Sequence, residues 1–319
     1  MIPQRERFLV VGAAGFIGSW LCRRILDDGH DVVGLVHRQP PKDSLFAKLD
    51  LLKQVDICRA GQVPLVGWLA SIAPDKIINL AGQSQVRLGL ACPAATFASN
   101  TAFVWELLDA IRTAGVATLV VQASTDAVYG GLGVTPAKED SALCATGPYE
   151  ASKAAAEIVV RSFTATYDLP AVVARLSNIY GPGDPNRARL VPDVMRALRA
   201  GRSPELRGGG RSVRAYLHVD EAIDAILLLA QHAHEKGIRG GAFNVAGVES
   251  YTTLQVARLA CTICGRENIE PVIGDEHPHE ISMKLCSTEK IFQRLGWRPR
   301  ITLADGLERL AHSPHEAGA

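Results

Sequence analysis

The glycine-rich stretch Gly12-Ala-Ala-Gly15-Phe-Ile-Gly18 directly follows an apolar run, Phe8-Leu-Val-Val11, near the start of the 319-residue chain. The apolar run predicts a buried strand, and the residues from Phe16 onward have the spacing of a helix. Glycines in such a turn let the backbone approach a pyrophosphate closely, and the N-terminus of the helix faces its negative charge. The stretch therefore predicts a dinucleotide site formed by Gly12, Gly15, Phe16, Ile17 and Gly18.

Strand-like apolar runs and helical patterns alternate through the first half of the chain. Strands are expected at residues 8–11, 32–36, 76–80, 118–122 and 171–176, and helices at 16–26, 96–111 and 149–163. This βαβ alternation predicts an α/β fold with a Rossmann-type, doubly wound parallel sheet that helices cover on both faces.

The composition changes after Asn178, where glycine and proline cluster at 181–185 and 208–210. Such a stretch indicates a smaller, mixed α/β substrate lobe, whereas 214–219 and the apolar helix at 222–230 indicate a return to the main sheet. We therefore expect a dinucleotide-binding domain from residues 1–176 plus about 213–247, and a substrate-binding lobe from about 177–212 plus 248–319.

The overall composition is that of a globular protein with a substantial core, because 47% of the residues are hydrophobic and 21% are charged. A net charge of +1 argues against a dedicated nucleic-acid binder, which needs a basic surface field. Charged Arg5, Glu6 and Arg7 precede a short apolar run, so neither a signal peptide nor a membrane span is expected there. We expect a cytoplasmic protein that binds neither nucleic acid nor membrane.

Seven cysteines are scattered from Cys22 to Cys286, and a domain of this size does not depend on disulfides. Cys261 and Cys264 form a C-x-x-C, which is compatible with half of a zinc site. The pair lies in a helical pattern that begins at Thr253, with no second pair nearby in the sequence. We therefore interpret it as part of a core helix, and expect reduced thiols and no bound metal.

The second predicted strand ends in Leu35-Val36-His37-Arg38, where a site selective for NAD places a carboxylate against the ribose 2′-hydroxyl. This chain has two basic residues there instead, which suit the 2′-phosphate of NADP. We therefore favour NADP over NAD, the other interpretation being that Arg38 is simply a solvated loop residue. Asp56 and Ile57 are assigned to the neighbourhood of the adenine.

Tyr149-Glu-Ala-Ser-Lys153 follows Gly147-Pro148 at the start of a predicted helix, and its spacing places Tyr149 and Lys153 on one helical face. An ammonium group near a phenol favours the phenolate and lowers the phenol pKa, so the tyrosine can exchange protons with a hydroxyl near neutral pH. Ser124-Thr125-Asp126-Ala-Val-Tyr129-Gly, at the end of a preceding strand, is predicted to bring further hydroxyl groups to the same substrate oxygen.

These residues together resemble the extended short-chain dehydrogenase/reductase family, which contains nucleotide-sugar epimerases, dehydratases and 4-keto reductases. The resemblance covers nearly the whole chain, and it depends on the order and spacing of the motifs. They are the glycine turn, Asn79-Leu-Ala-Gly82-Gln83, Asn100-Thr101, Val128-Tyr129-Gly130, Tyr149 with Lys153, Arg175-Leu-Ser-Asn178-Ile-Tyr-Gly-Pro182, Arg214-Ala-Tyr-Leu-His-Val219 and Leu295-Gly-Trp297.

The resemblance implies a role for each matching residue. Thr125 resembles the hydroxyl that binds the reacting sugar oxygen, Tyr149 the general acid/base, and Lys153 the residue that binds the nicotinamide ribose and tunes the tyrosine. Further cofactor contacts are implied for Leu80, Ala81, Gly82 and Asn100, and substrate contacts for Gln83, Asn178 and Arg214. The last two match positions that hold the diphosphate of a nucleoside diphosphate sugar. The family also implies a homodimer built on the helices at 96–111 and 149–163.

The residues after Thr125 bear on which reaction is catalysed. Dehydratases of the family commonly place Asp-Glu there, because loss of water needs an acid and a base besides the tyrosine. This chain has Asp126, a candidate catalytic residue, but also Ala127, which argues against a standard 4,6-dehydratase and leaves an atypical one open. Residues 79–86 and 122–125 are similar to the branch of GDP-mannose dehydratases and GDP-4-keto-6-deoxymannose reductases, which tends to use NADP. We therefore rank 4-keto reductase slightly above 4-epimerase, and both above dehydratase.

Two departures from the family pattern concern the substrate. Ala215 stands where an Asp often follows the diphosphate-binding arginine, and Glu276-His-Pro-His-Glu280 stands where relatives commonly have an arginine. One phosphate contact is therefore expected to be missing, with His277 or His279 as weak substitutes.

Two further functions remain open on the sequence. A non-catalytic protein that senses NAD(P) is disfavoured, because both Tyr149 and Lys153 are present. Reduction of a non-sugar ketone is disfavoured by the Val-Tyr-Gly and Asn-Ile-Tyr-Gly-Pro elements.

Overall fold

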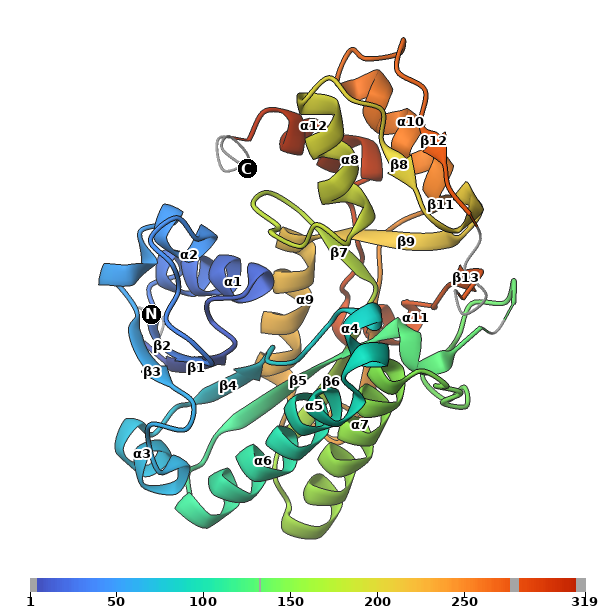
Figure 1. Cartoon of the computed structure of the whole chain (residues 1–319). Helices are drawn as coiled ribbons and strands as arrows, with labels where there is room; N and C mark the ends of the chain where they lie inside the picture. The colour runs from blue at the N-terminus through green and yellow to red at the C-terminus, as the bar shows by residue number, and fades with distance from the viewer. Residues whose placement is uncertain (1–4, 132, 276–280, 314–319) are drawn as a thin grey trace. The chain divides into compact units, whose positions relative to one another are not determined.

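The computed structural model describes residues 5–131, 133–275 and 281–313 (Figure 1). The chain divides into two compact units, each made of several stretches of sequence. The first comprises Met1–Val128, Ala145–Arg175 and Ile223–Phe243, and the second comprises Tyr129–Cys144, Leu176–Ala222 and Asn244–Ala319. None of the helices in the described ranges combines the length and the apolar character that crossing a bilayer requires.

A seven-stranded sheet organises the first unit, in the order β10-β6-β5-β4-β1-β2-β3. Its strands are β1 (Arg7–Val11), β2 (Asp31–Val36), β3 (Asp56–Arg59), β4 (Lys76–Asn79), β5 (Leu119–Thr125), β6 (Ala171–Leu176) and β10 (Ala242–Val245). β1 pairs in parallel with β2 and β4, and parallel pairing continues from β2 to β3 and from β4 to β5. The predicted doubly wound parallel sheet is confirmed. Because the strand order reverses at β1, the carboxyl ends of β1 and β4 mark the edge where such sheets bind their ligands.

Helices cover both faces of this sheet (Figure 1). The helical elements in this part of the fold are α1 (Phe16–Asp27), α2 (Leu45–Lys48), η1 (Leu51–Lys53), α3 (Leu65–Ile72), α4 (Val86–Ala91), α5 (Pro93–Phe97), the π turn η2 (Ala98–Ala102), α6 (Phe103–Ala114), η3 (Asp126–Tyr129), α7 (Pro148–Tyr167) and α9 (Val219–His232). Residues of α3, α6 and α7 form one apolar layer with the strands, which includes Leu107, Val120 and Val160. Burying each such side chain contributes about 1.5–3 kcal/mol, so this layer fixes α7 and the residues at its start against the sheet. On the opposite face, Arg24 of α1 forms an ion pair with Asp224 of α9 at 2.8 Å.

The second unit is built around β9 (Val213–His218), which pairs with β11, β13 and β7. Its other elements are β7 (Asn178–Tyr180), α8 (Leu190–Arg199), β8 (Glu205–Leu206), η4 (Gly208–Gly210), β11 (Ser250–Thr252), α10 (Thr253–Ile263), β12 (Val272–Ile273), β13 (Met283–Lys284), α11 (Glu289–Leu295) and α12 (Leu303–Ala311). Residues of α8, α10 and α12 share one apolar core that includes Met195, Val256 and Leu307. α10 begins with a capping box in which Thr252 and Gln255 satisfy each other's backbone amides.

The position of β9 corrects one expectation from the sequence. Residues 214–219 were expected to return to the main sheet, but β9 lies in the four-stranded sheet of the second unit. The main sheet ends instead in β10, which pairs with β6. A buried apolar strand is compatible with either sheet, because strand preference reflects the neighbours it packs against rather than the segment alone.

The C-x-x-C lies where the core-helix interpretation predicts. Both cysteines belong to the helical region of α10, which ends with Cys264 as its C-cap, and both are free thiols. Cys261 is buried in the apolar core of the second unit, and burial raises the pKa of its thiol. The pair is therefore packed as part of a hydrophobic helix face.

Candidate active site

The glycine turn after β1 leaves no room for a side chain at Gly12 or Gly18. Gly12 has a φ of +85°, and a Cβ on it would lie 3.0 Å from the backbone nitrogen of Ala81. A Cβ on Gly18 would lie 2.2 Å from the Gly12 carbonyl oxygen, and Gly15 is the N-cap of α1. The turn therefore brings the N-terminus of α1 to the carboxyl ends of β1 and β4. Gly15 is exposed at the N-terminus of α1, where the backbone can approach a pyrophosphate, and a cofactor of this kind would be held by Gly12, Gly15 and Gly18.

The loop after β4 joins this turn to the predicted catalytic helix. Gly82 has a φ of +151°, and a Cβ on it would lie 2.7 Å from Asn100 Oδ1 and 3.1 Å from Lys153 Nζ. Asn100 Oδ1 also accepts a hydrogen bond from the Gln83 backbone nitrogen at 2.7 Å. The structure thus brings Ala81, Gly82, Asn100 and Lys153 together, as the cofactor assignments require.

A π turn between α5 and α6 fixes the same loop to α7. Asn100 Nδ2 donates to Ser152 Oγ at 2.9 Å, and Thr101 Oγ1 donates to the Ser152 carbonyl oxygen at 2.8 Å. Both side chains are buried although they are adjacent in sequence. π turns insert an extra residue into a helix and are frequent at functional sites. Sequence reasoning did not single out Ser152, and its place directly before Lys153 was the one available signal.

Tyr149 and Lys153 lie in the first turns of α7, which begins after Gly147 with Pro148 at its first position. Lys153 Nζ donates to the Ala123 carbonyl oxygen at the end of β5, at 3.2 Å. Burial lowers the pKa of Lys153 from 10.5 to about 8, and the negative charge of Glu157 opposes this shift. Tyr149 is half-buried, and a Cβ on Gly89 of α4 would lie 3.3 Å from its Cβ. The backbone of α4 therefore packs closely on Tyr149, a contact that the sequence did not reveal.

Thr125 is the last residue of β5, the strand whose Ala123 carbonyl oxygen accepts the hydrogen bond from Lys153, and Asp126 directly follows it. Thr125 Oγ1 donates to Asp126 Oδ1 at 3.2 Å, and accepts a hydrogen bond from the Ala127 backbone nitrogen at 3.2 Å. All three residues are buried. Ala123 lies two residues before Thr125. The Lys153 ammonium therefore contacts the same short segment of β5 to which Thr125 belongs.

Three basic side chains lie at the carboxyl ends of β2 and β3. His37 and Arg38 follow β2 directly and are exposed. Arg59 ends β3, pairs in register with Val36 and is also exposed. Arg59 was not identified from the sequence, because the end of β3 was not predicted.

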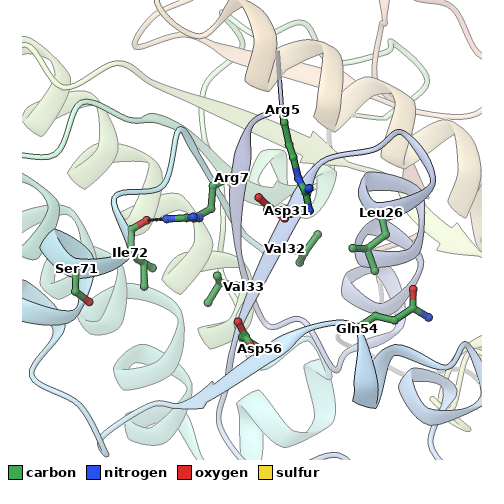
Figure 2. Close-up of a pocket in the computed structure, with 10 residues that line it drawn as sticks. All are labelled: Arg5, Arg7, Leu26, Asp31, Val32, Val33, Gln54, Asp56, Ser71 and Ile72. Atoms are coloured by element: carbon green, nitrogen blue, oxygen red, sulfur yellow. Dashed lines mark hydrogen bonds and ion pairs between the residues drawn. The ribbon is translucent and has the colours of Figure 1, made fainter. Parts of the chain in front are cut away.

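Asp56 and Ile57 lie elsewhere than the adenine assignment assumes. Asp56 begins β3 opposite Val33, and Ile57 pairs with Gly34 inside the sheet. Figure 2 shows Asp56 among residues that line a cavity of about 380 Å³ with Arg5. The structure therefore does not bring Asp56 to the ligand-binding edge, since β3 continues for three residues beyond it.

The predicted substrate residues of the second unit lie on adjacent strands. Asn178 Nδ2 donates to the Ala215 carbonyl oxygen at 3.2 Å. Arg214 donates from Nη2 to the Ile281 carbonyl oxygen at 2.5 Å and from Nη1 to the Ser282 carbonyl oxygen at 3.3 Å. The guanidinium thus holds the segment that leads into β13, and its assignment to a diphosphate stays a prediction.

Gln83 and the two histidines of the stretch 276–280 are the remaining predicted substrate residues. In the first unit, Gln83 Nε2 donates to the Gln85 carbonyl oxygen at 2.9 Å and to Thr96 Oγ1 at 3.2 Å. The stretch 276–280, with His277 and His279, lies outside the described residues.

Known proteins resemble this chain over almost its full length. It is 32% identical over 322 residues to the UDP-glucose 4-epimerase of Mycolicibacterium smegmatis, which covers 95% of this chain and 96% of that protein. It is also 32% identical over 312 residues to the dTDP-glucose 4,6-dehydratase of Streptomyces griseus, which covers 94% of this chain and 91% of that protein.

A solved structure agrees with the fold. DesIV, the dTDP-glucose 4,6-dehydratase of Streptomyces venezuelae with NAD and TYD bound, superimposes with a TM-score of 0.85 at 28% identity, covering 96% of this chain and 95% of that chain. The model of the NAD dependent epimerase/dehydratase family matches residues 8–246, which include the glycine turn, Thr125, Tyr149 and Lys153. The chain therefore belongs to the NAD dependent epimerase/dehydratase family.

Proposed function

We propose that this protein oxidises and re-reduces C4 of the sugar in a nucleoside diphosphate sugar, and that 4-epimerisation is its reaction. The observation that carries the proposal is the position of Lys153, whose ammonium contacts the Ala123 carbonyl oxygen and lies beside Gly82. Lys153 thereby connects α7, which carries Tyr149, to the loop after β4 (the cofactor loop, residues 80–83) and to β5, which ends in Thr125. The chain is 32% identical both to a UDP-glucose 4-epimerase and to a dTDP-glucose 4,6-dehydratase, and Ala127, which leaves Asp126 as the one carboxylate directly after Thr125, favours epimerisation over dehydration.

Each of three side chains has a defined task in this reaction. The Tyr149 phenolate accepts the proton of the C4 hydroxyl and returns it after the keto sugar has rotated. Thr125 hydrogen-bonds the same sugar oxygen, and the Lys153 ammonium stabilises the negative charge of the phenolate. A bound nicotinamide dinucleotide supplies the acceptor and the donor of the hydride.

A 4-keto reductase is the second candidate, because of the basic edge formed by His37, Arg38 and Arg59. Guanidinium groups suit a 2′-phosphate, and a reductase consumes NADPH rather than regenerating its cofactor. An atypical 4,6-dehydratase ranks third. Asp126 is present beside Thr125, but Ala127 offers no second carboxylate for the elimination of water.

Turnover by the wild type and by Tyr149→Phe tests the proposed function. UDP-, GDP-, CDP- and dTDP-hexoses are incubated with each protein, and the products are analysed by NMR. We expect the wild type to interconvert C4 epimers of one of them without net use of NAD(P)H, and the variant to lose at least about 100-fold in kcat. Tyr167→Phe, at the exposed end of the same helix, is the control and should retain full activity.

Other outcomes of this experiment identify the other reactions. A 4-keto-6-deoxy product would assign the dehydratase, and net oxidation of NADPH when a nucleoside diphosphate 4-keto sugar is supplied in place of the hexose would assign the reductase. Unchanged turnover in Tyr149→Phe would reject the catalytic assignment altogether.

We further propose NADP as the preferred cofactor, because Arg38 and Arg59 offer two cationic groups to a 2′-phosphate. Loss of one charge-assisted hydrogen bond costs about 1.5–3 kcal/mol, so Arg38→Ala and Arg59→Ala should each weaken NADP binding by about 10- to 100-fold. NAD binding should change little. Titration calorimetry with both dinucleotides measures this, with Arg112→Ala on α6 as the control. Equal losses for NAD and NADP would contradict the proposal.

A further inference from the structure

Glu157 carries a buried carboxylate one helical turn after Lys153. Its Oε1 accepts a hydrogen bond from Ser124 Oγ at 2.5 Å, and its Oε2 accepts one from Arg175 Nη2 at 2.6 Å. The side chains of Glu157 and Arg175 are only 3% and 6% exposed. Replacing a buried ion pair by apolar residues is often neutral or stabilising, so stability alone does not account for these charges. All three residues belong to the first unit.

The carboxylate and the Lys153 ammonium attach α7 to consecutive residues of β5. Lys153 binds the carbonyl oxygen of Ala123, and Glu157 binds the hydroxyl of Ser124. The next residue is Thr125, the predicted partner of the sugar oxygen. Successive side chains of a strand point to opposite faces, so Ser124 fixes the strand end while Thr125 faces the other way.

Glu157 is also the charge that acts on Lys153. Burial lowers the pKa of Lys153 to about 8, and Glu157 is the charged neighbour that raises it. Other elements bring uncharged groups near the ammonium, among them the backbone of Gly82 and the carbonyl oxygen of Ala123. Arg175 on β6 faces the carboxylate of Glu157.

Two further titratable groups belong to the same neighbourhood. Tyr149 lies one turn earlier on α7, and Asp126 follows Thr125, to which it is hydrogen-bonded.

We propose that Glu157 is a positioning residue for proton transfer, which keeps the Lys153 ammonium charged and in place while Arg175 and Ser124 hold its own carboxylate. The inference rests on the proposed function, since it assigns Lys153 to the reaction. It adds a buried Ser124-Glu157-Arg175 network to the catalytic side chains, and it predicts a change in pH dependence that loss of packing alone would not produce.

The decisive variant is the double substitution Glu157→Gln with Arg175→Met. Glu157→Gln alone leaves Arg175 buried without its partner, which endangers folding, whereas the double variant removes both charges. Without the carboxylate the Lys153 pKa falls further, so the ammonium loses its proton at lower pH. We expect the alkaline limb of the kcat/KM profile to move down by about one pH unit, which is about a fivefold loss at pH 8, where half of the wild-type Lys153 is protonated. Activity near pH 6.5 should be largely retained.

Ser124→Ala is the matched control, because it removes one hydrogen bond to the carboxylate and leaves both charges in place. It should lower activity equally at every pH. The proposal is overturned if the double variant keeps the wild-type alkaline limb, or if its loss is uniform in pH as in the control.

A second measurement separates this inference from the proposed function. If the wild type converts no nucleotide sugar, the proposed function fails. The pH dependence of NADH and NADPH binding then still tests Glu157, because Lys153 lies beside Gly82 in the cofactor loop. Binding by the double variant should weaken at a lower pH than binding by the wild type, and identical binding profiles would reject the role of Glu157.

Discussion

Lys153 shows how a single residue links function to stability in this protein. Its side chain is buried, and its pKa is lowered from 10.5 to about 8. The folded state therefore holds this proton less tightly than the unfolded chain. The unfolded state binds more protons between the two pKa values, so the stability of the folded protein rises with pH through that window. Below pH 8 the full penalty for burying the charge is present.

Lys153→Met is expected to abolish turnover and to stabilise the cofactor-free protein. At about 1.4 kcal/mol per pKa unit, the buried charge opposes folding by up to about 3 kcal/mol at pH 7. The Ala123 carbonyl oxygen keeps a partner in the variant, because it also accepts a hydrogen bond from Gln122. Urea denaturation measures the free energy of unfolding at pH 7 and pH 9.

The pH dependence of the free energy of unfolding distinguishes the removal of a buried charge from the stabilisation that a more apolar side chain provides by itself. The difference between variant and wild type should narrow by about 1 kcal/mol from pH 7 to pH 9, since the wild type gains stability over that range. Lys48→Met, at an exposed position of α2, should show no such narrowing. A constant difference at both pH values would mean that the Lys153 ammonium is not destabilised by burial.

The π turn η2 works as a unit that presents two adjacent side chains to α7. Asn100 and Thr101 would point in different directions in a regular helix, yet both bind Ser152. Through Asn100 the same turn also holds the backbone of Gln83. A displacement of this turn would therefore also move the backbone at Gln83 in the cofactor loop and Ser152 near the start of α7.

Thr101→Val removes one buried hydrogen bond from this turn without changing the size of the side chain much. We expect the free energy of unfolding to fall by about 1 kcal/mol, and kcat to fall by about fivefold to 10-fold with little change in KM. Thr252→Ala, which removes the N-cap of α10 in the second unit, should cost a similar amount of stability and leave kcat unchanged. Steady-state kinetics and urea melts compare the two, and matching kcat values would exclude a positioning role for η2.

The sequence predicts those parts of the molecule in which local signals suffice. The turn at Gly12 and the Tyr149-Lys153 pair each lie within a few residues, so spacing alone indicates their geometry. Partners that lie far apart in the chain escaped prediction, such as Ser152 with Asn100 and the two charges Glu157 and Arg175. These contacts depend on how α7 packs on its neighbours, which the periodicity of one segment does not encode.

Element boundaries limited the rest of the prediction. The sequence does not predict the end of β3, and the assignment to the adenine falls on Asp56, whereas the structure has Arg59 at the ligand-binding edge. The partner of β9 was misjudged because a short apolar strand is compatible with several neighbours. The sequence thus predicts the presence of the elements better than the edge of the sheet to which a given residue belongs.

Large apolar side chains remain exposed on the helices of the first unit that the family resemblance assigns to a homodimer. Trp105 on α6 is 46% exposed and Ile158 on α7 is 56% exposed. Figure 1 shows α6 and α7 side by side on one face of the sheet. Apolar surface of this kind marks contact sites, which supports the proposal that two copies pair through α6 and α7.

In the proposed dimer, Ile158→Glu would place a carboxylate inside the apolar contact, so this variant is expected to be monomeric. Sedimentation velocity at micromolar concentration measures the change. Val66→Glu, an exposed position on α3, should leave the dimer intact. A wild type that sediments as a monomer would contradict the proposed pairing.

The interleaving of the two units along the chain has a consequence for synthesis on the ribosome. The first unit needs Ile223–Phe243, and its last strand, β10, ends at Val245. The main sheet therefore cannot be completed until about three quarters of the protein has been translated. Until then, the edge of β6 that pairs with β10 remains unpaired. Nascent chains that stall before β10 should consequently be sensitive to proteases and dependent on chaperones, whereas those released after it should resist digestion.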